Sequence, residues 1–130
     1  MNIKEIENYW LNSADDALDT AIQLFKAKKF SHSMFFLHLS VEKLLKALFV
    51  NHKNIEPPFG HNLVNLSLKI TEVKFEKSQL ELLSQISTFN IAARYDDYKQ
   101  NFYKTCDKKF ATKYLKASKD IIKWLKSQMK

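Results

Sequence analysis

The chain has 130 residues, of which 45% are hydrophobic and 27% are charged, and its formal net charge at pH 7 is +7. This length and composition fit one soluble globular domain, which we expect to span residues 1–130. One glycine and two prolines are too few for the tight turns of a β-rich protein. The sequence therefore predicts an all-α fold of long helices with few connections.

Several features argue against secretion and membrane insertion. Cys106 is the single cysteine, which excludes an intrachain disulfide and suits a reducing compartment. The first seven residues mix apolar and acidic side chains and lack the core of a signal peptide. No uncharged apolar run approaches the roughly 18 residues that are needed to span a bilayer. We expect a cytoplasmic protein with no membrane partner.

The first half of the chain predicts two long amphipathic helices. Residues 3–28 carry apolar side chains at steps of three or four, among them Trp10 and Ala14, as in a helix with one buried face. A second helix begins near Ser31 or Ser33, either of which could cap it, and ends near His52. The proline–glycine cluster at residues 56–60 then predicts the clearest loop of the chain.

The second half predicts three further helices. Asn62 caps a short third helix that turns Leu63, Leu66 and Ile70 inward, and a fourth helix opens at Ser78. No helix breaker stops the fourth helix before residue 98, so its end stays open between residues 94 and 98. Thr105 or Asp107 caps a last helix that runs to Met129. Five helices with short connections predict a single-domain antiparallel up-and-down bundle.

The positive charge is concentrated in the last helix. Residues 1–103 carry equal numbers of basic and acidic side chains, so the whole excess lies in residues 104–130. Lys109, Lys113, Lys116 and Lys123 share one face of that helix, at spacings that match its turns. Such a face predicts non-specific nucleic-acid binding or docking on an acidic partner. The alternative, a solvated outer face without a partner, is the commoner role of basic helix faces.

A polar set accompanies the core stripe of the second helix. His38, Glu42 and Lys46 follow one another at intervals of four residues and therefore lie on one face. A buried carboxylate is costly without a cation, so Glu42 needs Lys46 or Arg94 as a partner. We interpret the set as a polar seam that holds a ligand or orients a catalytic group. The alternative is a structural ion pair between the second and fourth helices.

Arg94 is the single arginine among 21 basic residues. Its planar guanidinium grips carboxylate or phosphate with two parallel hydrogen bonds, which lysine does not do. In a continuing helix Asp97 and Tyr98 lie one turn below it, and the three form a candidate catalytic set for a phosphodiester. Tyr95 joins the candidate ligand-binding residues. The alternative is a salt bridge from Arg94 to Glu42 or Asp97.

No metal or cofactor site is predicted. The chain has no cysteine pair, no clustered histidine and acid pattern, and no glycine-rich phosphate loop. His61 follows Gly60 and is expected to hold the loop in place.

Four stretches together resemble the HEPN domain family (higher eukaryote and prokaryote nucleotide-binding). They are Trp10 with Ala14 and Asp16-Ala17, then "FSHSMFFLHLSVEKLLKALFV" with Glu42-Lys43-x-x-Lys46-Ala47, then "PPFGHNLVNL", and finally "NIAARYDDY". The resemblance implies a helical bundle that commonly pairs as a homodimer. Small bacterial members are often encoded beside a minimal nucleotidyltransferase, and some such pairs are toxin–antitoxin systems.

Many members of this family are metal-independent endoribonucleases, whose motif is an arginine, four to six residues and then a histidine. Arg94 matches the arginine, but Lys99, Gln100 and Asn101 stand where the histidine would fall. We therefore expect a non-catalytic or weakly active partner of a nucleotidyltransferase, with a nucleotide or RNA as ligand. One alternative is an endoribonuclease toxin that uses Arg94 with Tyr98 or Asp97 from two facing subunits. The other is a structural interaction module.

Overall fold

The computed structural model describes the backbone of residues 1–94 and 96–130 and the side chains of residues 1–90 and 100–130. The described backbone forms six helices joined by short connections and contains no strand. They are α1 (Ile3–Lys26), α2 (Phe30–Lys53), α3 (Leu63–Leu68), α4 (Lys77–Arg94), α5 (Asp96–Thr105) and α6 (Lys108–Ser127). The predicted all-α antiparallel bundle is confirmed, with one helix more than the five expected.

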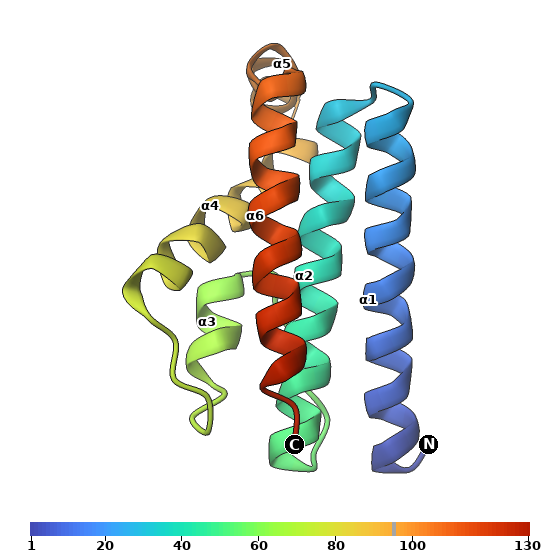
Figure 1. Cartoon of the computed structure of the whole chain (residues 1–130), viewed down its shortest axis with the longest axis vertical. Coiled ribbons are helices and arrows are strands. Elements are labelled where there is room, and N and C mark those ends of the chain that lie inside the picture. The colour runs from blue at the N-terminus through green and yellow to red at the C-terminus, as the bar shows by residue number, and fades with distance from the viewer. Residues whose placement is uncertain (95) are drawn as a thin grey trace.

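The helix α2 is the centre of the bundle, because each of the other five helices packs against it. Figure 1 shows α1, α2 and α6 as three long upright helices, with α3 and α4 on the other side of α2 and α5 across one end. Buried residues occur on every side of α2, including Leu37, Leu44 and Leu48. A helix that is surrounded by neighbours has little solvent-facing surface to fill with polar side chains, which explains its largely apolar sequence.

The most extensive contact in the fold joins α1 to α2. The residues of α1 that face α2 are small, and Ala14, Ala17 and Ala21 are almost completely buried. Small side chains let two helix backbones approach closely. Two serines of α2 are therefore near enough to α1 to form hydrogen bonds with its backbone. Ser33 Oγ donates a hydrogen bond to the backbone oxygen of Ala21 at 2.6 Å, and Ser40 Oγ donates one to Ala14 at 2.9 Å.

Aromatic side chains join α4, α5 and α6 at one end of the bundle. The ring of Phe89 lies 5.2 Å from that of Tyr114 and 5.4 Å from that of Phe102, measured between centroids. Phe110 contacts the same group at 5.8 Å from Phe89. Rings at these separations attract one another beyond the effect of their burial. The cluster therefore attaches the short polar helix α5 to the rest of the core.

Most predicted helix ends are confirmed, and the predicted cap of α2 is wrong. Asn62 and Asp107 cap α3 and α6, since their side chains accept hydrogen bonds from the backbone nitrogens of Asn65 and Phe110. The second helix begins at Phe30, before either predicted cap, and its N-cap residue Lys29 makes no capping hydrogen bond with its side chain. Ser33 is instead inside the helix, where its hydroxyl is used to bind α1.

The structure contains an additional helix after the predicted fourth helix. The helix α4 starts at Lys77, one residue before the predicted Ser78, and ends at Arg94, after which α5 covers most of the stretch that was expected to connect to the last helix. Gln79 Oε1 accepts a hydrogen bond from the backbone nitrogen of Glu76 at 2.8 Å, in the manner of a capping box.

The final residues are held against the end of α2. His52 Nε2 donates a hydrogen bond to the backbone oxygen of Gln128 at 2.7 Å, and the backbone nitrogen of Lys130 donates one to Asn51 Oδ1 at 2.9 Å. Asn51 Nδ2 also donates to Glu7 Oε1 at 3.3 Å, which satisfies a buried carboxylate of α1. Each helix of the described residues is too short or too polar to span a lipid bilayer.

Candidate functional site

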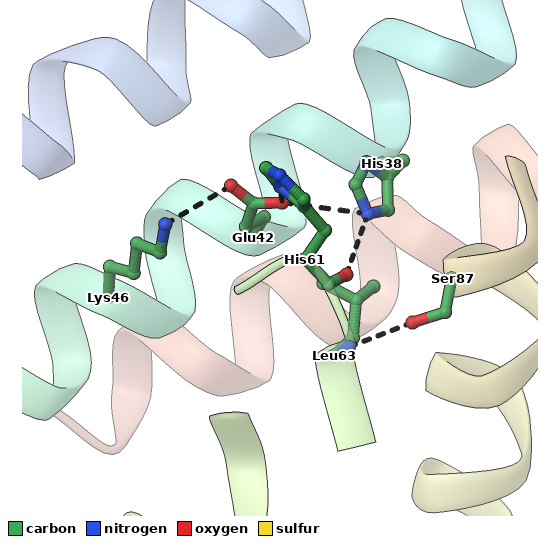
Figure 2. A network of polar contacts seen from close by, with 6 residues as sticks. All are labelled: His38, Glu42, Lys46, His61, Leu63 and Ser87. Carbon is green, nitrogen blue, oxygen red and sulfur yellow. Dashed lines mark hydrogen bonds and ion pairs between the residues drawn. The ribbon is translucent and has the colours of Figure 1, made fainter. Parts of the chain in front are cut away.

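A buried carboxylate on α2 is the centre of the polar cluster. Glu42 is 4% exposed, and both of its oxygen atoms are occupied. Oε2 pairs with Nζ of Lys46 at 3.3 Å, and Oε1 accepts a hydrogen bond from Nδ1 of His61 at 2.9 Å (Figure 2). Since a desolvated carboxylate needs a compensating charge, these contacts explain how Glu42 is tolerated inside the bundle.

His61 comes from the loop before α3 and reaches α2 from outside. Its backbone oxygen accepts a hydrogen bond from Nε2 of His38 at 3.1 Å, while its ring binds Glu42 (Figure 2). One loop residue is thus held at two points by side chains one turn apart on α2. The expectation that His61 holds the loop is met, and Glu42 is what holds it.

The contact with Glu42 fixes the proton arrangement of the His61 ring. A carboxylate accepts hydrogen bonds, so Nδ1 must carry the proton, and in the neutral ring the lone pair is then on Nε2. The side chain of His61 is 45% exposed, and among the described residues Nε2 has no hydrogen-bond partner. His38 and His52 use the opposite nitrogen, because each donates from Nε2 to a backbone oxygen.

Lys46 is held from two sides. Besides its contact with Glu42, its Nζ atom lies 5.0 Å from the centre of the Trp10 ring on α1, which is cation–π distance. Lys46 is itself 7% exposed. Its ammonium therefore contacts the Glu42 carboxylate and the Trp10 ring and is largely shielded from bulk solvent.

A groove whose lining residues are mostly polar runs between α3 and α4 and includes His61. Its volume is about 480 Å³. The described residues that line it are His61, Asn62, Val64, Asn65, Ser84, Ser87, Thr88 and Asn90. Ser87 Oγ accepts a hydrogen bond from the backbone nitrogen of Leu63 at 2.8 Å, which joins the two walls (Figure 2).

Asn90 is the least satisfied residue of this groove. It is 9% exposed, and its Oδ1 atom is buried without a hydrogen-bond partner among the described residues. A buried polar atom in that state costs about 1–3 kcal/mol of folding free energy. The wall of the groove therefore contains an unmet hydrogen-bonding capacity, which a ligand meets only if the Asn90 side chain turns outward.

The structure brings together three of the predicted ligand-binding residues, His38, Glu42 and Lys46. His38 Nε2 lies 3.7 Å from Glu42 Oε1. The other predicted site residues, Arg94, Tyr95, Asp97 and Tyr98, lie outside the residues whose side chains are described. The predicted pairing of Glu42 with Lys46 is found, and a pairing with Arg94 lies outside the described part.

The four predicted nucleic-acid-binding lysines all lie on α6. Lys109, Lys113, Lys116 and Lys123 are exposed. None of them forms an ion pair with a described carboxylate, whereas Lys126 on the same helix pairs with Asp15 at 2.8 Å. Lys113 Nζ lies 5.3 Å from the centre of the Tyr114 ring. We call these four residues the lysine face.

Cys106 and the acidic residues offer no further reactive centre in the described part of the chain. Burial, assisted by the neighbouring Asp107 carboxylate, raises the pKa of Cys106 to about 12. A thiol in this state is a poor nucleophile near neutral pH. Within the described side chains, no group of three or more His, Cys, Asp and Glu residues is placed to hold a metal ion.

Sequence reasoning missed His61 and Asn90 as members of the site. The contact between His61 and Glu42 joins residues 19 positions apart that lie on different elements. The periodicity of one helix cannot predict a contact of this kind. Asn90 did leave a signal, since it is an amide at a position where α4 turns toward the core beside Phe89. A polar residue on a core stripe was a reason to look for a ligand or a partner there.

The comparisons with known proteins agree on the fold. The family model described as HEPN domain matches residues 7–128. The crystal structure of TT1696 from Thermus thermophilus superposes with a TM-score of 0.83 and 18% sequence identity, and the match covers 99% of this chain and 100% of that chain. At this identity the likeness shows the fold alone. The search of curated proteins gives no match.

Proposed function

The chain belongs to the HEPN domain family, and from this membership we propose that it is the nucleotide- or nucleic-acid-binding partner of a minimal nucleotidyltransferase, in a toxin–antitoxin-like pair. The absence of the motif histidine supports a binding role over an enzymatic one. Arg94 stands where the ribonucleases of the family carry their arginine, and residues 99–101 offer Lys, Gln and Asn instead of the histidine.

The observation that carries the proposal is the polar cluster around Glu42 beside the α3–α4 groove. A buried Glu–Lys pair with a histidine hydrogen-bonded to the same carboxylate forms a rigid polar wall. The groove next to it has a volume of about 480 Å³, within the usual range for sites of small ligands. A preformed recess of this size, lined mostly by polar residues, suits a small ligand such as a nucleotide.

The lysine face supports a second contact, with a polyanion. Four exposed ammonium groups without carboxylate partners among the described residues can replace the counterions of a nucleic acid. Because lysine contacts phosphate as a point charge, this binding would not depend on base sequence.

The test is nucleotide-dependent thermal stabilisation of the purified chain. ATP, GTP and short RNA are each expected to raise the melting temperature, because a ligand that binds only the folded state stabilises it. Glu42→Gln is expected to reduce the shift, and Glu81→Gln, an exposed glutamate on α4, is the matched control. Unchanged melting temperatures with all ligands would remove the binding role.

The ribonuclease alternative is tested in the same preparations. Labelled RNA is incubated with the chain and with its Arg94→Ala variant. Under the binding proposal the RNA stays intact in both samples. Cleavage that disappears in Arg94→Ala would favour the endoribonuclease toxin.

The proposed partners require separate measurements. We propose that the chain forms a homodimer and binds a nucleotidyltransferase encoded beside it. Light scattering after size exclusion is expected to give twice the mass of 15.3 kDa. Co-expression with the neighbouring nucleotidyltransferase is expected to give a complex that elutes as one peak from the same column. A monomer that does not bind the transferase would favour a structural interaction module.

A further inference from the structure

We propose that the α3–α4 groove binds the uncharged part of the ligand, namely the sugar and base of a nucleoside, with His61 Nε2 and the Asn90 amide as its hydrogen-bonding groups. The inference rests on the proposed function and narrows it. It states which part of a nucleotide this groove takes, and it leaves the phosphates outside.

The first support is the charge of the lining. The described residues around the groove are two serines, a threonine, three asparagines, a valine and a histidine, with no lysine, arginine or carboxylate among them. A phosphate buried against such walls would lose its hydration without gaining a cation, which is unfavourable. Hydroxyl and amide groups match instead the alcohols of a sugar and the edge of a base.

The second support is the state of Asn90. Its Oδ1 atom is buried without a partner among the described residues, although the residue lines the groove. An amide presents an acceptor and a donor side by side, which is the arrangement that pairs with the amino and ring-nitrogen edge of adenine. Because this oxygen is buried, a base in the groove would satisfy it only after the Asn90 side chain turns toward the groove.

The third support is the way in which Glu42 orients His61. Because Nδ1 donates to a buried carboxylate, the neutral ring keeps Nε2 as an acceptor on a side chain that is 45% exposed. Rotation of the ring would break the 2.9 Å contact, so the acceptor is held in one position. A ribose hydroxyl is a donor of the kind that such an acceptor binds. Glu42 is thus a positioning residue for His61.

The experiment is calorimetric titration of the intact chain with adenosine, ATP and orthophosphate. Adenosine is expected to bind, and orthophosphate is expected neither to bind in the groove nor to compete with adenosine. His61→Phe keeps an aromatic ring but removes the acceptor, and Asn90→Ala removes the amide. Each is expected to weaken adenosine about tenfold, as the loss of one hydrogen bond predicts. His32→Phe, at an exposed histidine near the start of α2, is the matched control.

A second measurement uses the unaltered protein, so a folding defect in a variant cannot decide the outcome. Long-range nitrogen–proton NMR spectra of the His61 ring are expected to show the Nδ1-protonated form before adenosine is added. Addition of adenosine is expected to shift the Nε2 resonance of His61 and to leave that of His32 unchanged. A ring protonated on Nε2 alone would overturn the inference.

The remaining outcomes separate this inference from the proposed function. If ATP binds while adenosine neither binds nor competes, the groove does not hold the nucleoside, but the nucleotide-binding role stands. Equal losses in His61→Phe and His32→Phe would also overturn the inference alone. If ATP, RNA and adenosine all fail to bind, both proposals fall.

Discussion

Lys46 Nζ lies 3.3 Å from a carboxylate oxygen of Glu42 and 5.0 Å from the centre of the Trp10 ring. One ammonium therefore joins α1 to the buried acid of α2. Among the described hydrogen bonds and ion pairs, no residue of α1 contacts Glu42 directly, so Lys46 is the link between this carboxylate and α1.

We predict that Lys46→Ala lowers the free energy of unfolding by about 3 kcal/mol, because it leaves a buried carboxylate with only a histidine for compensation. Chemical denaturation followed by circular dichroism measures the change. Lys43→Ala is the matched control, since Lys43 lies on the same helix, is less buried and makes no ion pair with a described residue. Equal losses in the two variants would show that the Glu42 contact adds nothing.

The serine hydroxyls between α1 and α2 give a second prediction. Ser40→Ala is expected to reduce the free energy of unfolding by about 1 kcal/mol, because it removes a buried hydrogen bond to the Ala14 carbonyl. Ser13→Ala on α1 is the control, since the Ser13 hydroxyl has no hydrogen bond to a described residue. Urea midpoints of the two variants are compared, and a Ser40→Ala midpoint equal to that of Ser13→Ala would contradict the prediction.

Cys106 is predicted to resist alkylation in the folded protein. With its pKa raised to about 12, the fraction of reactive thiolate near neutral pH is very small, and burial limits access as well. Iodoacetamide labelling followed by mass spectrometry is expected to be slow in buffer and fast in denaturant. Rapid labelling of the folded chain would show that the thiol is exposed.

The same thiol predicts a dependence of stability on alkaline pH. The folded state holds the Cys106 proton to a higher pH than the unfolded state, whose pKa is near the ordinary value of 9.0. Stability from this group is therefore complete below about pH 9 and falls as the pH rises toward 12. Cys106→Ala is expected to lose less stability than the parent chain over this range, as measured by urea denaturation. Parallel losses would contradict the prediction.

The turn between α1 and α2 contains a position that suits glycine. Lys28 has φ of +63°, and the backbone nitrogens of Lys28 and Lys29 donate to Phe25 and Leu24 as in a Schellman motif. Lys28→Gly is expected to raise the free energy of unfolding by about 1 kcal/mol, because glycine adopts this conformation without steric cost. Lys29→Gly, at φ of −96°, is expected to give no gain. Thermal melts of both variants provide the comparison.

Salt dependence tests the lysine face. The log of RNA affinity falls linearly with the log of salt concentration, by about 0.7 for each phosphate neutralised on a single strand. Replacement of Lys109, Lys113, Lys116 and Lys123 by Gln is expected to reduce this slope by about 3 in all. Lys126→Gln is the control, because Lys126 is already paired with Asp15. An unchanged slope in the fourfold variant would mean that the lysine face does not contact the RNA phosphates.

The helices were well predicted from the sequence because the buried face of a helix gives a periodic pattern of apolar residues. The stripe of Leu63, Leu66 and Ile70 and the caps Asn62 and Asp107 are local features, and the structure has all of them. The cap of α2 was mispredicted because Ser33 faces α1, and a hydroxyl that binds a neighbouring helix looks the same in sequence as one that caps its own helix.

The site was only partly predictable. His38, Glu42 and Lys46 share one helix, so their spacing reveals their common face. The partner His61 depends on how the proline-containing loop returns to α2, which is a matter of tertiary packing. The groove depends on two helices that meet side by side, and Asn90 acquires its unmet oxygen only when α4 is packed.

The α1–α2 hairpin also has a consequence for how the protein is made. All of its contacts, including the two serine–carbonyl bonds, lie within the first 53 residues. A unit built from such near neighbours in the chain can assemble quickly and before the remaining helices have left the ribosome. The amides of these two helices are then expected to be the earliest protected in pulse-labelled hydrogen exchange, ahead of those in α4 and α6.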